Sequence, residues 1–121
     1  MTLMEFRRKV NAVLAADYEH ETPDVVRSKK FNQLIKKMLV ETFPEAEVIP
    51  TKGAWCSASG FLKFNGACIY YNFQDYRYWD WTEQILYRTA KDEHDYHGDA
   101  NNYTDLYHLR EDVCRLVKRA A

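Results

Sequence analysis

The dipeptide Asn65-Gly66 lies between two runs of mainly apolar and aromatic residues, within the segment 57–73. Asn and Gly tolerate the positive φ angles of a type I′ turn, whose twist matches that of two flanking antiparallel strands. The sequence therefore predicts a two-residue hairpin. The cross-strand pairs on the side that we expect to face the core are Phe64–Ala67, Leu62–Ile69 and Gly60–Tyr71.

The opposite face of this hairpin is mixed in polarity. Its expected pairs are Lys63–Cys68, Phe61–Tyr70 and Ser59–Asn72. A face of this kind is either half covered or open to solvent. Phe61 and Tyr70 are therefore ambiguous between the core and a contact surface.

Apolar residues recur at helical spacing in three further segments. The first covers about residues 3–15, where Thr2 and Glu5 match a capping box. The second runs from Pro23 to about Thr42 and ends because Pro44 disfavours helical geometry at the preceding residue. The third begins near Thr104 and continues to the end of the chain.

Two other segments are expected to be strands, one short at 48–51 and one within 81–91. The second of these could instead begin a helix at Glu83-Gln84, and 92–102 is expected to be a loop. The sequence thus predicts the α+β class, in the order helix, helix, three or four antiparallel strands, helix, with the helices packed on one face of the sheet. One domain, 1–121, is expected, because two cores would each have only about 60 residues.

Charge is distributed unevenly along the chain, although the net charge is only -1. Residues 1–43 carry eight Lys or Arg against six Asp or Glu, whereas residues 75–105 carry three against eight. This balance argues against a simple, strongly basic nucleic-acid binder. The acidic region is either a solvated surface, or one that meets a basic partner or mimics nucleic-acid phosphates.

The cysteines Cys56, Cys68 and Cys114 are odd in number and lack metal-type spacing, so no disulfide framework is predicted. This favours a reducing compartment. The N-terminal residues contain no apolar stretch typical of a signal peptide, and no window approaches the roughly 20 apolar residues that span a bilayer. We expect a cytoplasmic protein that does not bind membranes.

Seven of the twelve residues in 70–81 are aromatic, and charged residues alternate with rings at the end of this run. Tyr, Trp and Arg contribute most to binding energy in protein interfaces, and neighbouring carboxylates would repel nucleic-acid phosphates. The predicted partner-binding residues are Tyr76, Tyr78, Trp79, Trp81, Asp75, Asp80 and Glu83. In the alternative interpretation, these rings cap the core or, less readily, stack on bases.

A second hypothesis is nucleic-acid binding through the basic side of the second helix. The residues concerned are Arg27, Lys29, Lys30, Lys36 and Lys37. A helix, three strands and a helix also form the element order of a double-stranded RNA-binding domain. Those domains have a basic start to their last helix, whereas this chain has Tyr103-Thr104-Asp105 there.

A third hypothesis is a small metal-dependent enzyme, in which His94 and His97 share a metal ion with nearby carboxylates. The alternative is a solvated polar loop. Cys56 offers a nucleophile, but no positioned base accompanies it in the sequence, and the four glycines form no phosphate-binding loop. No catalytic residue and no cofactor is predicted, and the pattern favours a protein that is not an enzyme.

A small chain with an acidic-aromatic segment, no catalytic set and no targeting segment resembles the accessory proteins of phages and mobile elements, including anti-CRISPR and anti-restriction inhibitors. The resemblance implies a non-enzymatic protein that occupies a surface of a host nucleic-acid-handling enzyme. The oligomeric state is left open.

Overall fold

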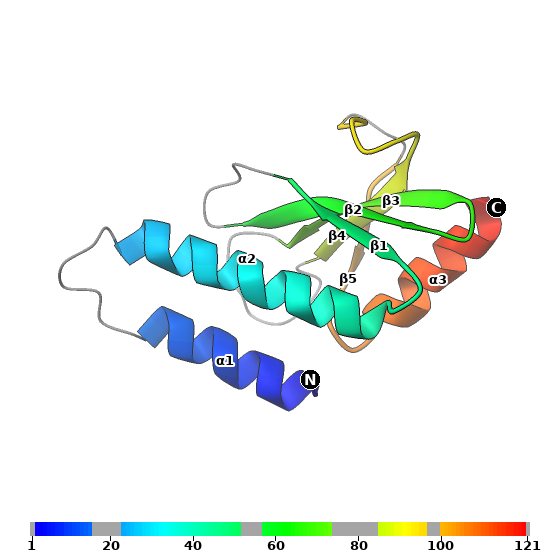
Figure 1. Ribbon diagram of the computed structural model, residues 1–121. Helices are drawn as coiled ribbons and strands as arrows, with labels where there is room; N and C mark the ends of the chain where they lie inside the picture. The colour runs from blue at the N-terminus through cyan, green and yellow to red at the C-terminus, as the bar shows by residue number, and fades with distance from the viewer. Residues whose placement is uncertain (1, 16–22, 52–56, 74–84, 97–99, 121) are drawn as a thin grey trace.

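A computed structural model of the chain describes residues 2–15, 23–51, 57–73, 85–96 and 100–120 (Figure 1). Helices and strands within these ranges follow one another in the order α-α-β-β-β-β-β-α. Their bounds are α1 Leu3–Ala15, α2 Pro23–Thr42, β1 Glu47–Pro50, β2 Ala58–Phe64, β3 Ala67–Phe73, β4 Ile85–Ala90, β5 Asn102–Thr104 and α3 Leu109–Ala120. The predicted α+β class is confirmed.

The five strands form an antiparallel sheet in which every strand pairs with its neighbours in the chain, in the order β1-β2-β3-β4-β5. Helix α2 packs against β1 and β2, α3 packs against β3 and β4, and α1 packs against α2. Figure 1 shows the helices on one side of the sheet and the connection after β4, in yellow, on the other. We call the helix side the first face and the other side the second face.

The β2–β3 hairpin has the predicted turn and the predicted register. Asn65 and Gly66 adopt φ angles of 51° and 77°, as a type I′ turn requires. All six predicted cross-strand pairs are present, from Phe64–Ala67 at the turn to Ser59–Asn72. Because side chains alternate between the two faces of a strand, this register determines which hairpin residues face the helices.

The hydrophobic core lies between the helices and the first face of the sheet. The helices contribute Phe6, Val10, Phe31, Ile35, Met38, Leu39, Leu109, Val113 and Val117. The sheet contributes Ala58, Leu62, Phe64, Ile69, Tyr71, Phe73 and Ile85, and Phe43 follows α2. Each fully buried large apolar side chain contributes about 1.5–3 kcal/mol relative to an exposed one. Burial also raises the pKa of the Tyr71 hydroxyl well above its ordinary value.

The helix ends follow the sequence signals at α1 and α2. The Glu5 amide donates a hydrogen bond of 3.1 Å to the Thr2 hydroxyl, which is the expected N-cap. The last turn of α2 closes with the Phe43 amide on the Leu39 carbonyl at 2.8 Å, immediately before Pro44. No helix in the described part of the chain combines the length and apolar character needed to cross a bilayer.

The C-terminal part differs from the prediction. A fifth strand, β5, occupies Asn102–Thr104, where we expected the end of a loop, and α3 begins at Leu109 rather than near Thr104. A turn at 106–108 separates the two elements, and the Asp105 carboxylate accepts a hydrogen bond from the His108 amide at 2.9 Å. The Asp105 side chain therefore closes the turn that precedes α3. β1 is also shifted by one residue, to Glu47–Pro50.

Candidate functional site

All seven predicted partner-binding residues lie outside the described part of the chain. These are Tyr76, Tyr78, Trp79, Trp81, Asp75, Asp80 and Glu83. Their assignment to a binding surface stays a prediction. The segment before them is described, and it shows that Tyr71 and Phe73 of β3 belong to the core.

An aromatic cluster of Phe61, Tyr70 and Tyr96 lies on the second face of the sheet. The ring centroids of Phe61 and Tyr70 are 5.3 Å apart, and the Tyr96 ring lies 5.8 Å from Phe61 and 6.5 Å from Tyr70. Phe61 is 0% exposed, Tyr70 is half-buried, and Tyr96 is 55% exposed. Phe61 is thus an interior residue, and Tyr96 presents the accessible edge of the cluster.

Arg88 of β4 is buried beside this cluster, with only 3% of its surface exposed. Its guanidinium lies 4.4 Å from the centroid of the Tyr70 ring, a cation–π arrangement. It donates hydrogen bonds to the backbone carbonyls of Thr89 at 3.2 Å and Asp95 at 2.9 Å. Among the described residues no carboxylate forms an ion pair with Arg88, so ring and carbonyl dipoles stabilise its charge.

The hydrogen bond from Arg88 to the Asp95 carbonyl connects β4 to the loop at residues 91–96. We call this segment, which includes Tyr96, the acidic loop. The Asp92 carboxylate accepts from the His94 amide at 2.8 Å, and the Asp95 carboxylate accepts from the Lys91 amide at 3.0 Å. Glu93 pairs with Lys63 at 3.1 Å, and this hydrogen bond lowers the pKa of the Glu93 carboxyl. Side-chain bonds to the backbone therefore define the shape of the loop.

Tyr103 is the second exposed ring on this face. It pairs with Leu86 in the β4–β5 register, so it projects to the same side as Tyr70, and it is 51% exposed. We call Tyr96, Tyr103 and the acidic loop the acidic-tyrosine surface. Rings held on a sheet beside carboxylates suit the binding of a partner that presents Arg or Lys.

Tyr96 and Tyr103 were not among the residues selected from sequence. The predicted hairpin register already placed Tyr70 beside Phe61 on this face, but the contact between Tyr96 and that pair requires the loop to fold back over the sheet. Tyr103 lies in β5, a strand of three residues that has no periodic pattern in the sequence.

The lysines of the second hypothesis are placed on one side of α2. Lys29, Lys30, Lys36 and Lys37 are exposed, whereas Phe31, Ile35 and Leu39 face the core. The side chain of Arg27 lies outside what the structure describes. The predicted basic face is therefore present for four of its five residues.

The proposed metal ligands are only partly described. His94 is exposed and belongs to the acidic loop, and His97 lies outside the described ranges. Within those ranges, no three His, Cys, Asp or Glu side chains are grouped so that they could hold a metal ion. A site shared by His94 and His97 stays a prediction.

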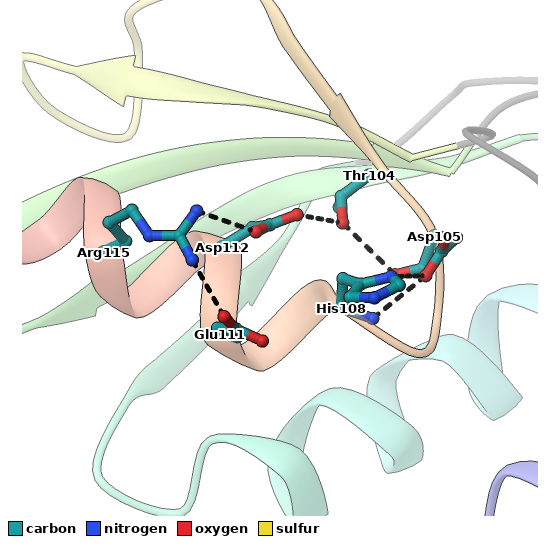
Figure 2. Close-up of polar contacts among 6 residues, drawn as sticks. All are labelled: Thr104, Asp105, His108, Glu111, Asp112 and Arg115. Carbon is teal, nitrogen blue, oxygen red and sulfur yellow. Dashed lines mark hydrogen bonds and ion pairs between the residues drawn. The ribbon is translucent and has the colours of Figure 1, made fainter.

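A polar network at the start of α3 connects six residues (Figure 2). The buried Thr104 hydroxyl donates to the Asp112 carboxylate at 2.7 Å, and Arg115 reaches Asp112 at 3.4 Å and Glu111 at 2.8 Å. Asp105 contacts both the amide and Nδ1 of His108 at 2.9 Å.

An imidazole oriented by a carboxylate is used in general-base catalysis. Among the described residues, however, His108 has only Asp105 as a side-chain hydrogen-bond partner, and no hydroxyl or thiol is bonded to its ring. The network links β5 to α3 and satisfies backbone groups at the helix start.

This network makes stability depend on pH through His108. The hydrogen bond with Asp105 raises the pKa of the His108 imidazole above its ordinary value of 6.5. A raised folded-state pKa stabilises the fold fully below pH 6.5, and this contribution disappears as pH rises through the folded pKa. As pH rises from 6.5 through the raised pKa of His108, we expect the urea midpoint of the wild-type protein to decrease relative to that of His108→Gln. Parallel midpoint curves for the two proteins would contradict the linkage.

Comparison of the chain with protein-family models, curated proteins and solved structures finds no match in any of the three.

Proposed function

We propose that this protein is a non-enzymatic protein-binding module whose acidic-tyrosine surface binds a basic patch on a partner. The observation that supports this proposal best is that the exposed Tyr96 of the acidic loop packs on Phe61 and Tyr70, while the exposed Tyr103 of β5 projects from the same face of the sheet. A ring that is already ordered loses little conformational entropy on binding. Tyrosines held in this way are therefore effective interface anchors.

The charge around the surface indicates the kind of partner. Residues 91–112 contain seven Asp or Glu and only two Lys or Arg. Surfaces that bind nucleic acid are rich in Lys and Arg, and an array of carboxylates is complementary to them. We therefore propose a nucleic-acid-handling enzyme as the partner, inhibited because its nucleic-acid site is occupied.

This proposal agrees with the resemblance to phage and mobile-element inhibitors of host defence enzymes. The free thiols of Cys68 and Cys114 fit action in the reducing cytoplasm. The segment 75–83, with Tyr78 and Trp79, stays a second predicted binding segment outside the described residues. It joins β3 to β4 in the chain and has the same combination of rings and acids.

Binding is tested by immobilising the protein, capturing its partner from extracts of the native host, and identifying that partner by mass spectrometry. The double variant Tyr96→Ala/Tyr103→Ala should weaken binding of the purified partner by on the order of 100- to 1,000-fold, since each anchor contributes about 2 kcal/mol. Tyr107→Ala/Val40→Ala is the matched control, because both residues are exposed but lie outside the acidic-tyrosine surface.

The identified partner should be an enzyme that acts on DNA or RNA, with activity that falls as this protein is added. Excess duplex DNA should compete with the protein for the enzyme. The proposal fails if both double variants bind equally well, or if the captured partner has no nucleic-acid site that DNA can occupy.

A further inference from the structure

A separate basic surface lies on the helices, on the first-face side of the sheet. Along α1 and α2 the chain carries eight Lys or Arg and three Asp or Glu. The exposed basic residues on these helices are Arg8, Lys29, Lys30, Lys36 and Lys37. Helices α1 and α2 lie on the opposite side of the sheet from the acidic loop (Figure 1).

The two helices contribute to one continuous surface. Helix α1 packs directly along α2. The exposed basic residues of α1 and α2 therefore lie on neighbouring helices. We call this α1–α2 region the basic surface.

Three charges on the basic surface have no carboxylate partner in the described part of the chain. Among those residues, Arg8, Lys29 and Lys36 form no ion pair. Some basic residues elsewhere have carboxylate partners: Lys63 pairs with Glu93 at 3.1 Å, and Arg110 pairs with Glu45 at 2.8 Å. Positive charges that lack internal partners are available to an external polyanion.

The spacing of the lysines fits a phosphate backbone. Lys29 and Lys36 are seven residues, or two turns, apart, which places them about 10 Å from each other along the helix axis. Lys30 and Lys37 form a parallel pair one residue on. Duplex DNA has one negative charge per roughly 1.7 Å of its axis, so an array of four lysines can contact several phosphates at once.

The residues between the lysines indicate a duplex rather than a single strand. Besides the lysines, Gln33, Val40 and Glu41 are exposed along this part of α2, and none offers a ring on which an unpaired base could stack. Lysine ammonium groups recognise charge without reading bases. We propose that the basic surface of α1 and α2 binds the phosphate backbone of duplex DNA, independently of sequence.

The proposal is tested by fluorescence anisotropy with a labelled 20-base-pair DNA duplex between 50 and 200 mM salt. Four phosphate contacts give a slope of about -3.6 in log K against log salt, or an affinity loss of about 150-fold over this range. Lys29→Gln/Lys36→Gln should reduce the slope to about -1.8 and the loss to about 12-fold.

Lys118→Gln/Arg119→Gln is the matched control, because it removes two exposed charges from α3 and leaves α2 unchanged. Wild-type behaviour of this control, with the reduced slope of the α2 variant, supports the proposal. Equal effects of the two variants would show that only net charge matters and would overturn it. Absence of binding at 50 mM salt, or tighter binding of heparin or duplex RNA than of DNA, would also overturn it.

Discussion

Gly60→Ala is expected to destabilise the protein by about 3 kcal/mol, because β2 has no room for a methyl group at this position. A Cβ atom on Gly60 would overlap the carbonyl oxygen of Ile49, lie 2.6 Å from the Tyr71 hydroxyl and lie 2.9 Å from Cα of Pro50. Two of these three neighbours are backbone atoms of β1, which cannot rotate away. The measurement is the free energy of unfolding from urea denaturation.

Two comparisons isolate the cause of this loss. In the double variant Gly60→Ala/Tyr71→Phe the hydroxyl is absent, so part of the stability should return, while the contacts with β1 remain. Gly66→Ala introduces the same methyl group in open space at a φ of 77°, and should cost only about 1 kcal/mol through backbone strain. A Gly60→Ala protein as stable as wild type would show that β1 does not approach β2 this closely.

Phe61→Ala is expected to destabilise the protein by about 4 kcal/mol, as is usual for truncating a fully buried phenylalanine. Phe61 is 0% exposed although it lies on the second face, away from the helices. The change would leave a cavity beneath Tyr96 and beside Tyr70. Urea denaturation measures the loss, and amide exchange in residues 91–96 should become faster because the loop loses its support.

Phe61→Leu is the control for this experiment, since it retains most of the apolar volume and should cost less than half as much. Tyr96→Ala should change stability by about 1 kcal/mol or less because its ring is already half exposed. If Phe61→Ala also cost less than 1 kcal/mol, the second face would be open at this position. The aromatic cluster could not then order the acidic loop.

The parts of the fold that were predicted correctly depend on local signals. Asn65-Gly66 determines both the turn and the register of β2 and β3, because a two-residue loop leaves only one way to pair the strands. The start of α1 and both ends of α2 likewise follow from Thr2, Pro23 and Pro44. In each case the determining residues lie within a few positions of the feature.

The missed elements depend on contacts that a short segment cannot encode. β5 has three residues and forms only through its pairing with β4, so no periodic pattern identifies it. Thr104 resembles a helix cap in the sequence, but its hydroxyl bonds Asp112 from the end of the strand. Asp105 instead closes the turn that separates β5 from α3.

The candidate site depends even more on contacts between residues that are distant in the sequence. Arg88 lies in a predicted strand, where a charged residue normally indicates the solvent side. Its burial depends on the Tyr70 ring and the Asp95 carbonyl, which only the folded sheet and loop bring together. The basic face of α2 was easier to predict, because exposed lysines at helical spacing need no long-range contact.

The strand order β1-β2-β3-β4-β5 has a consequence for the kinetics of folding. Every strand pair joins neighbours in the chain, so the sheet can grow by successive hairpins without closing a long loop between distant strands. Such local pairing corresponds to a low contact order and rapid folding for a sheet of this size. Strands β2 and β3, joined by the shortest loop, are the natural nucleus, on which the other strands and then the helices assemble.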